Sequence, residues 1–149
     1  MIAAIRKADA YGQGFATVEL IGCALVDLAV HRQQAAEADP RAFVEVELTR
    51  LGMPPEIGMR HRFPYFTHIF DGGYSAAYYS YAWSEALDAD AFEAFCETGD
   101  IFDPHLAARF RDEILAVGDS RDPMDSFRAF LGRAPNAEAL MRARHLVDA

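Results

Sequence analysis

The chain has 149 residues, of which 52% are hydrophobic, so it is long and apolar enough to bury a core, and this composition excludes an intrinsically disordered protein. The formal net charge of −9 argues against nucleic-acid binding, because affinity for a phosphate backbone comes mainly from clustered Lys and Arg. The two cysteines, Cys23 and Cys96, lack the spacing of a small disulfide framework, and we expect buried or half-buried thiols in a reducing compartment.

The apolar segments are short. The longest, residues 20–30, is interrupted by Gly22 and Asp27 and falls below the roughly 20 residues that span a bilayer. Residues 1–14 contain no apolar stretch of signal-peptide length. The sequence therefore favours a cytoplasmic protein that does not enter a membrane.

Hydrophobic periodicity predicts three helices in the first part of the chain. The second repeats apolar residues at steps of three and four, which is typical of a half-buried helix. An Asp-Pro pair begins the third, because Asp caps a helix and proline suits its first position, and Gly52 ends it. The predicted helices span residues 2–10, 17–35 and 40–51, and the expected inward stripe of the second is Val18, Ile21, Leu25 and Leu28.

Residues 60–73 do not show this helical periodicity. Pro64 and two glycines prevent a long helix, so we expect an ordered loop that includes one extended piece. The helical pattern resumes over residues 74–98, with a kink or break expected near residues 88–90, and Gly99 ends it.

Three shorter helices are predicted after Gly99. Asp103-Pro104 and Asp122-Pro123 begin the first two, and Asn136 caps the third. Almost every periodic segment is thus helical. The sequence predicts an all-α protein without significant sheet, forming a single helical domain over residues 1–149.

A row of tyrosines follows a lone histidine and a glycine pair within residues 66–83. On a helix, steps of four and three would place three of the tyrosines on one face, with Tyr79 pointing elsewhere. The glycines provide a hinge, and imidazole and phenol are donors suited to a developing oxyanion. The alternative is that the tyrosines simply pack in the core. The candidate site residues are His68, Gly72, Gly73, Tyr74, Tyr78 and Tyr81.

Other polar motifs are less informative. The basic triplet Arg60, His61 and Arg62 either contacts an anion, such as a peptide carboxylate, or is solvated or salt-bridged. The sequence contains no His-Glu-x-x-His, no pair of histidines four residues apart and no Cys-His cluster, so the chain lacks a recognisable zinc ligand set.

The segment FTHIFDGGYSAAYYSYAWSEALDADAFEAF resembles the signature region near the C-terminus of the thimet oligopeptidase family of zinc metallopeptidases. It is most similar to the peptidyl-dipeptidase (Dcp) and oligopeptidase A branch. The runs GFATVELIGCALVDLAVH and LGMPPEIGMRHR upstream resemble the same enzymes, and the run GDIFDPHLAARFRDEILAVGDSRDPMDSFRAFLGRAPNAEALMRARHL downstream resembles their closing helices. The resemblance therefore covers essentially the whole chain.

This resemblance implies that the chain is the C-terminal piece of a large helical, zincin-type catalytic domain, whose zinc is bound by His-Glu-x-x-His and a distal Glu located upstream of it. It implies that His68 faces the zinc-bound substrate and that Tyr78 and Tyr81 donate hydrogen bonds to the scissile carbonyl and the substrate backbone. It also implies that Tyr74 positions the peptide from the glycine loop.

The same resemblance implies the partners of the chain, which are short peptides and the remainder of the catalytic domain. The fragment alone would then bind no zinc and cleave no peptide. Apolar surface that the missing part normally covers would favour self-association. The alternative is a non-catalytic helical module, derived from the same family, that binds peptides or a partner protein.

Overall fold

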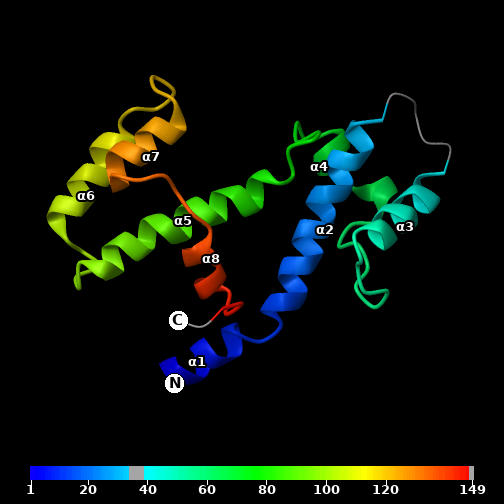
Figure 1. Cartoon of the computed structure of the whole chain (residues 1–149), viewed down its shortest axis with the longest axis horizontal. Coiled ribbons are helices and arrows are strands. Elements are labelled where there is room, and N and C mark those ends of the chain that lie inside the picture. The colour runs from blue at the N-terminus through cyan, green and yellow to red at the C-terminus, as the bar shows by residue number, and fades with distance from the viewer. Residues whose placement is uncertain (34–38, 148–149) are drawn as a thin grey trace. The chain divides into compact units, whose positions relative to one another are not determined.

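The computed structural model describes residues 1–33 and 39–147, and the regular secondary structure of this part of the chain is entirely helical (Figure 1). The all-α prediction is therefore confirmed. Contacts between Cα atoms divide the chain into two compact units, unit 1 (Met1–Trp83) and unit 2 (Ser84–Ala149). Each unit is described by itself, and the single domain expected over residues 1–149 stays a prediction.

The helices follow one another in simple order. In unit 1 they are α1 (Ile2–Asp9), α2 (Gln13–His31), α3 (Pro40–Arg50), the 3₁₀ helix η1 (Phe63–Tyr65) and α4 (Thr67–Phe70). Helix α5 (Ser80–Glu97) begins in unit 1 and continues into unit 2. Unit 2 continues with α6 (Pro104–Phe110), the π-helix η2 (Arg111–Leu115), α7 (Pro123–Leu131) and α8 (Glu138–Ala143).

Aspartate caps begin three of these helices at the predicted residues. The side chain of Asp39 accepts the backbone N–H groups of Arg41 and Ala42 at 3.0 and 3.2 Å. Asp103 caps α6 and Asp122 caps α7 in the same way, each followed by a proline at the first helical position. Because these caps satisfy N–H groups that have no partner within the helix, the Asp-Pro starts are confirmed.

Helix α2 packs into the core of unit 1 through a different face from the one predicted. Val18, Ile21 and Leu25 are each 38% exposed. The buried residues of α2 are Gly22, Cys23, Ala24, Val26 and Asp27. The predicted inward stripe is wrong for Val18, Ile21 and Leu25, while Leu28 is half-buried, because apolar residues occur on more than one face of this helix. The helix also begins at Gln13 and ends at His31, and residues 34–35 of the prediction lie outside the described part of the chain.

The core of unit 1 joins α2 to the aromatic segment that follows α3. Its buried residues are Cys23, Ala24, Val26, Phe63, Phe66, Ile69 and Tyr78. Helix α3 covers one side of it with the partly buried Phe43, Val44 and Leu48. The core therefore ties the predicted site region to α2.

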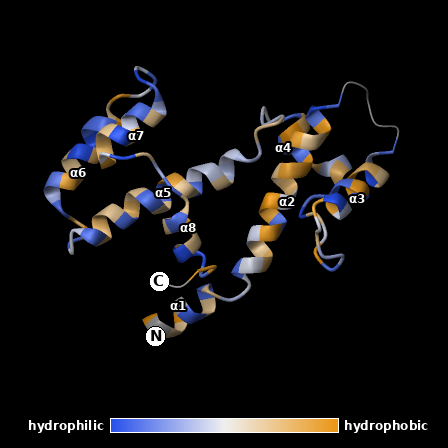
Figure 2. Ribbon diagram, viewed as in Figure 1, coloured by the Kyte–Doolittle hydropathy of each residue, from blue (hydrophilic) through white to orange (hydrophobic). Residues whose placement is uncertain are grey.

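By length and composition, α2 alone among the helices of the described residues could cross a membrane, so the sequence estimate of its apolar length is too low. Figure 2 shows the hydrophobic residues along it. The core helix of a soluble protein passes the same test. Asp27, near the C-terminal end of α2, is fully buried and hydrogen-bonded to the backbone of Ala76 and Tyr78. One face of α2 thus packs in the core of unit 1, although only 28% of its apolar window is buried.

Two predictions for the middle of the chain are wrong. The loop at residues 60–73 contains η1 and α4 rather than an extended piece. Helix α5 begins at Ser80 instead of residue 74, and it runs without a break through residues 88–90. Residues 75–79 form turns, in which Ala76 takes a left-handed backbone conformation with φ of +57° that a helix cannot include.

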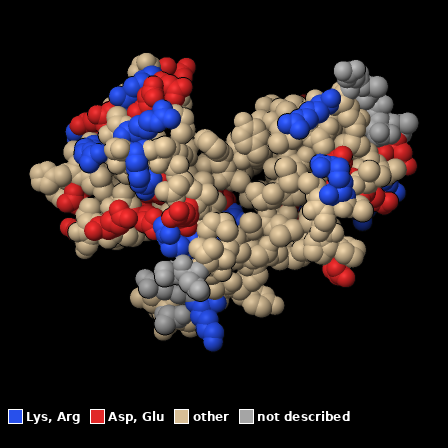
Figure 3. Space-filling view, in the orientation of Figure 1, with Lys and Arg blue, Asp and Glu red and all other residues tan. Residues whose placement is uncertain are grey.

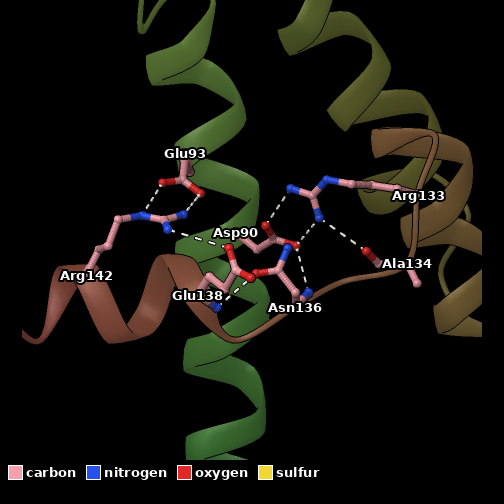
Figure 4. A network of polar contacts seen from close by, with 7 residues as sticks. All are labelled: Asp90, Glu93, Arg133, Ala134, Asn136, Glu138 and Arg142. Atoms are coloured by element: carbon pink, nitrogen blue, oxygen red, sulfur yellow. Dashed lines mark hydrogen bonds and ion pairs between the residues drawn. The ribbon is translucent and has the colours of Figure 1, made fainter. Parts of the chain in front are cut away.

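Unit 2 combines an aromatic core with an ion pair between a buried carboxylate and a partly exposed arginine. The ring of Phe130 packs against Phe110 and Phe127, with centroids 5.3 and 6.3 Å apart. On α5, the fully buried Asp90 accepts two hydrogen bonds from Arg133, at 2.6 and 2.7 Å (Figure 4). Basic and acidic side chains are interspersed over α6 and α7 on the face that Figure 3 shows.

The same network attaches α8 to α5. The backbone N–H of Asn136 donates to Asp90 at 3.2 Å, and Arg142 donates to Glu93 at 2.6 and 2.9 Å (Figure 4). The side chain of Asn136 also accepts the N–H of Glu138 at 2.8 Å, but the N-cap position of α8 is Ala137, one residue later than predicted.

Candidate functional site

The structure brings the predicted histidine and three tyrosines together. The rings of Tyr74 and Tyr81 stack with centroids 5.7 Å apart, and Tyr78 meets Tyr81 edge-on at 5.0 Å. The ring of His68 lies 6.4 Å from Tyr74 and 6.0 Å from Tyr78. We call these four residues, together with His61, the His–Tyr cluster.

The cluster forms by a different route from the predicted helical face. Tyr74 and Tyr78 belong to the segment before α5, and only Tyr81 lies on the helix itself. Tyr79, which was expected to point elsewhere, is exposed. Side chains that a single helix would have aligned are thus gathered by a turn that folds against α2.

His61 is a member of the cluster that the sequence pattern did not single out. Its Nε2 lies 3.4 Å from the hydroxyl of Tyr78, and its ring stacks on Phe66 at 4.7 Å. Burial, followed by the charges of His68 and Arg60, lowers the pKa of His61, which favours the neutral imidazole. A neutral ring nitrogen can accept a hydrogen bond from the phenol. In the sequence, His61 stands out only as part of a basic triplet.

The tyrosines of the cluster differ in exposure. Tyr78 is only 5% exposed, whereas Tyr74 and Tyr81 are 39% and 38% exposed and His68 is exposed as well. Burial raises the pKa of Tyr78, and desolvation together with the neighbouring Tyr74 raises the pKa of Tyr81. Both phenols therefore keep their protons near neutral pH and remain hydrogen-bond donors. The core-packing alternative describes Tyr78, while His68, Tyr74 and Tyr81 are exposed and His61 is half-buried.

The glycine pair brings His68 close to Tyr74. A Cβ on Gly72 would lie 3.0 Å from the carbonyl oxygen and 3.1 Å from the Cα of His68, so no larger residue fits without movement of the backbone. Gly73 has a φ of +78°, in the left-handed region that favours glycine. The N–H of Tyr74 donates to the carbonyl of His68 at 3.2 Å. In this structure the glycines therefore allow a close turn, in addition to the hinge expected from the sequence.

A groove of about 440 Å³ lies beside the cluster, between α3 and η1. It is mainly apolar, and His61 contributes to both the groove and the cluster. Of the two arginines considered as carboxylate ligands, Arg62 lines the groove. The lining residues are Arg41, Val44, Glu45, Leu48, Met59, His61, Arg62, Phe63, Pro64 and Tyr65.

The described residues do not fit a zinc site by themselves. Among residues 1–33 and 39–147, no group of three or more His, Cys, Asp or Glu could hold a metal ion. His61 and His68 supply two imidazoles 5.6 Å apart, whereas catalytic zinc usually has three protein ligands.

Comparison with known proteins connects this site to a peptidase family. A sequence model of Peptidase family M3 matches residues 1–146. The dipeptidyl carboxypeptidase of Salmonella typhimurium is 36% identical over 149 residues, covering 95% of this chain and 21% of that protein. Oligopeptidase A of Escherichia coli is 51% identical over 81 residues, covering 54% of this chain and 12% of that protein. The chain thus spans about a fifth of the relative that it matches along most of its length.

Proposed function

This chain belongs to peptidase family M3, and we propose that it forms the C-terminal part of the catalytic domain of a cytoplasmic zinc metallopeptidase that hydrolyses short peptides. The observation that carries the proposal is the assembly of His68, Tyr74, Tyr78 and Tyr81 into one cluster. The relatives named dipeptidyl carboxypeptidase and oligopeptidase A support peptide hydrolysis.

The residues of this chain act as hydrogen-bond donors in the proposed reaction. His68 and Tyr81 face outward, and protonated donors of this kind stabilise the negative charge that develops on a carbonyl oxygen under attack. Tyr74 stacks on Tyr81 and would position the peptide backbone beside the glycine turn. The buried Tyr78 contacts the ring of Tyr81 and so orients it. The hydroxyl of Tyr78 would also donate a hydrogen bond to a substrate that lies close enough.

We propose that zinc is held by residues outside this chain, which contains no His-Glu-x-x-His and whose described residues form no ligand set. We therefore propose that the chain binds no zinc stoichiometrically and cleaves no peptide alone. The remainder of the catalytic domain is its main partner. Neither nucleic acid nor a membrane is a proposed partner, in keeping with the net charge of −9 and with the core contacts of α2.

The surface of α2 supports a partner of this kind. Val18, Ile21 and Leu25 line an apolar groove of about 390 Å³ together with Leu51 and Met53. We propose that the remainder of the peptidase covers this groove and that the isolated chain self-associates through it. Light scattering should show species larger than a monomer, and Ile21→Glu should reduce them. A concentration-independent monomer would contradict this part of the proposal.

The proposal is tested with a hybrid peptidase, in which this chain replaces the matching residues of the Salmonella typhimurium dipeptidyl carboxypeptidase. The folded, zinc-loaded hybrid should hydrolyse peptides. Tyr81→Phe should lower kcat on the order of 100-fold, the typical effect of losing one oxyanion donor. Tyr79→Phe is the matched control, because Tyr79 is an exposed tyrosine outside the cluster, and it should change kcat by less than about twofold.

Two results would overturn the proposal. One is a folded, zinc-loaded hybrid that hydrolyses no peptide. The other is zinc-dependent hydrolysis by the isolated chain that His68→Ala abolishes, because the chain would then contain a complete active site.

A second candidate function is a non-catalytic module that binds peptides or a partner protein. The groove between α3 and η1 favours this function. Its apolar walls suit the side chains of a peptide, and Arg41 and Arg62, which line it, could bind a free carboxylate. Calorimetric titration of the isolated chain with short peptides separates the two functions. The module would be favoured if the isolated chain binds peptides, Arg62→Ala weakens this binding, and the hybrid peptidase is inactive.

A further inference from the structure

A buried carboxylate on α2 contacts the backbone of the turn that carries the tyrosines. Asp27 is fully buried, and its two oxygens accept the N–H groups of Ala76 at 3.0 Å and Tyr78 at 2.9 Å. We propose that Asp27 is the positioning residue that holds residues 74–78 in the conformation that assembles the His–Tyr cluster. This inference rests on the proposed peptidase function and extends it to a residue that touches no substrate.

The hydrogen bonds of Asp27 are well suited to this role. A buried carboxylate is stable only when its oxygens are occupied by donors, and hydrogen bonds to a charged acceptor are stronger than neutral ones. The Nδ1 of His31, one helical turn further along α2, lies 2.8 Å from Oδ1 of Asp27 and 2.9 Å from its backbone carbonyl oxygen. Asp27 is thereby held from α2 itself, and its remaining acceptor capacity points at the backbone of Ala76 and Tyr78.

The conformation that Asp27 holds is unfavourable by itself. Ala76 has a φ of +57°, although its Cβ makes the left-handed region unfavourable. The pattern of residues 74–79 is helical, and the sequence predicts that the helix starts at residue 74. The structure instead starts α5 at Ser80. The contact with Asp27, which lies 49 residues before Ala76, gives a physical reason for this difference.

A second anchor fixes the beginning of the same turn. The hydroxyl of Ser75 donates to the carbonyl oxygen of Ile69 at 2.7 Å, and Ile69 belongs to the same buried core as Tyr78. The turn is therefore held at Ser75 by α4 and at Ala76 and Tyr78 by α2. Without Asp27, the anchor at Ser75 would remain and residues 76–79 would be free to become helical.

The first test uses amide hydrogen exchange, measured by NMR on the 149-residue chain. Asp27→Asn keeps the size of the side chain but places an NH₂ group against one of the two backbone donors. The amides of Ala76 and Tyr78 should exchange about tenfold faster or more, as expected for loss of a charge-assisted hydrogen bond. Asp90→Asn is the matched control, because Asp90 is equally buried and its hydrogen-bond partners Arg133 and Asn136 belong to unit 2. It should leave the exchange of Ala76 and Tyr78 unchanged.

The second test uses the hybrid peptidase. Asp27→Asn should lower kcat about tenfold or more, with KM within about twofold, because the donors lose their orientation while the binding surface remains. Adding Ala76→Gly should restore part of the lost kcat, since glycine takes a φ of +57° without strain. Asp90→Asn should change kcat by less than about twofold.

The outcomes separate this inference from the proposed function. If Tyr81→Phe lowers kcat but Asp27→Asn changes neither kcat nor the exchange of Ala76 and Tyr78, the inference alone is wrong. If Tyr81→Phe has no effect in an active hybrid, the donor role that the proposed function gives to Tyr81 is wrong. Should Asp27→Asn fail to fold, the double variant with Ala76→Gly is measured in its place. Failure of both to fold, while Asp90→Asn folds, would assign Asp27 to overall stability and overturn the inference.

Discussion

Substitution of Gly72 by alanine tests whether the close turn beside His68 requires a residue without Cβ. The added Cβ would lie 3.0 Å from the carbonyl oxygen and 3.1 Å from the Cα of His68. Both contacts are with backbone atoms, which cannot rotate away as a side chain can. Overpacking of this size costs about 1–3 kcal/mol, and relief requires a shift of a few tenths of an ångström in residues 68–72.

The effect of Gly72→Ala is measured by urea unfolding of the isolated chain and by kcat of the hybrid peptidase. We expect a loss of about 1–3 kcal/mol in the free energy of unfolding. We also expect a fall in kcat of about tenfold or more, because the turn sets His68 against Tyr74. Gly73→Ala should cost about 1–2 kcal/mol for a different reason, since its added Cβ would meet no atom within 4 Å but its φ is +78°.

Gly58→Ala is the matched control for both variants. A Cβ on Gly58 would meet no atom within 4 Å, and its φ lies outside the left-handed region. This variant should unfold within about 0.5 kcal/mol of the unchanged chain. If Gly72→Ala behaved like Gly58→Ala in both stability and kcat, the turn would not depend on the absence of a side chain, and our account of its geometry would be wrong.

Three further predictions follow from the buried groups and the backbone. Arg133→Ala should lower the free energy of unfolding by about 2–3 kcal/mol at pH 7, because it leaves Asp90 buried without its cation. Arg133 holds the pKa of Asp90 below its ordinary value. The difference in the free energy of unfolding between the two chains should therefore be largest above the unfolded-state pKa of about 3.9, and it should disappear as the pH falls through the lower folded-state pKa. Urea unfolding at pH 7 and at pH 2 measures this change. A thiol reagent should modify the exposed Cys96 in the folded chain much faster than Cys23, since Cys23 is fully buried and burial raises its pKa; equal rates would contradict the structure. Ala76→Gly should raise the melting temperature, because it removes the cost of about 1 kcal/mol that an alanine incurs in the left-handed conformation. A lower melting temperature in a thermal scan would argue against strain at this position.

Features that depend on neighbouring residues could be predicted from the sequence. The starts of α3, α6 and α7 follow from Asp-Pro pairs, because a cap and the first helical position lie next to each other in the chain. The buried face of α2 could not be predicted in the same way. Val18, Ile21 and Leu25 form a regular apolar stripe, but Cys23, Ala24 and Val26 on another part of the helix are the apolar residues that enter the core, and periodicity alone does not identify the buried face.

The candidate site shows the same division between local and distant effects. His68, the glycines and the tyrosines are adjacent in the sequence, and their resemblance to a peptidase signature singles them out together. His61 joins them only because the chain between α3 and η1 returns its ring to Phe66 and Tyr78. The late start of α5 likewise depends on Asp27, whose distance in the sequence from Ala76 leaves no local signal.

The origin of the cluster bears on how the two parts of the proposed active site cooperate. Its five members lie within residues 61–81, and Asp27, which holds their turn, lies on α2 of the same unit. The donors can therefore be arranged by unit 1 itself, without the segment that would bring zinc. Because none of these residues belongs to a possible metal-binding group among the described residues, replacing Tyr81 or Asp27 in the hybrid peptidase should lower kcat while leaving its zinc content unchanged. Loss of zinc from these variants, measured by atomic absorption, would mean that the donor side of the site also supports the metal, and the division of roles proposed for the two segments would be wrong.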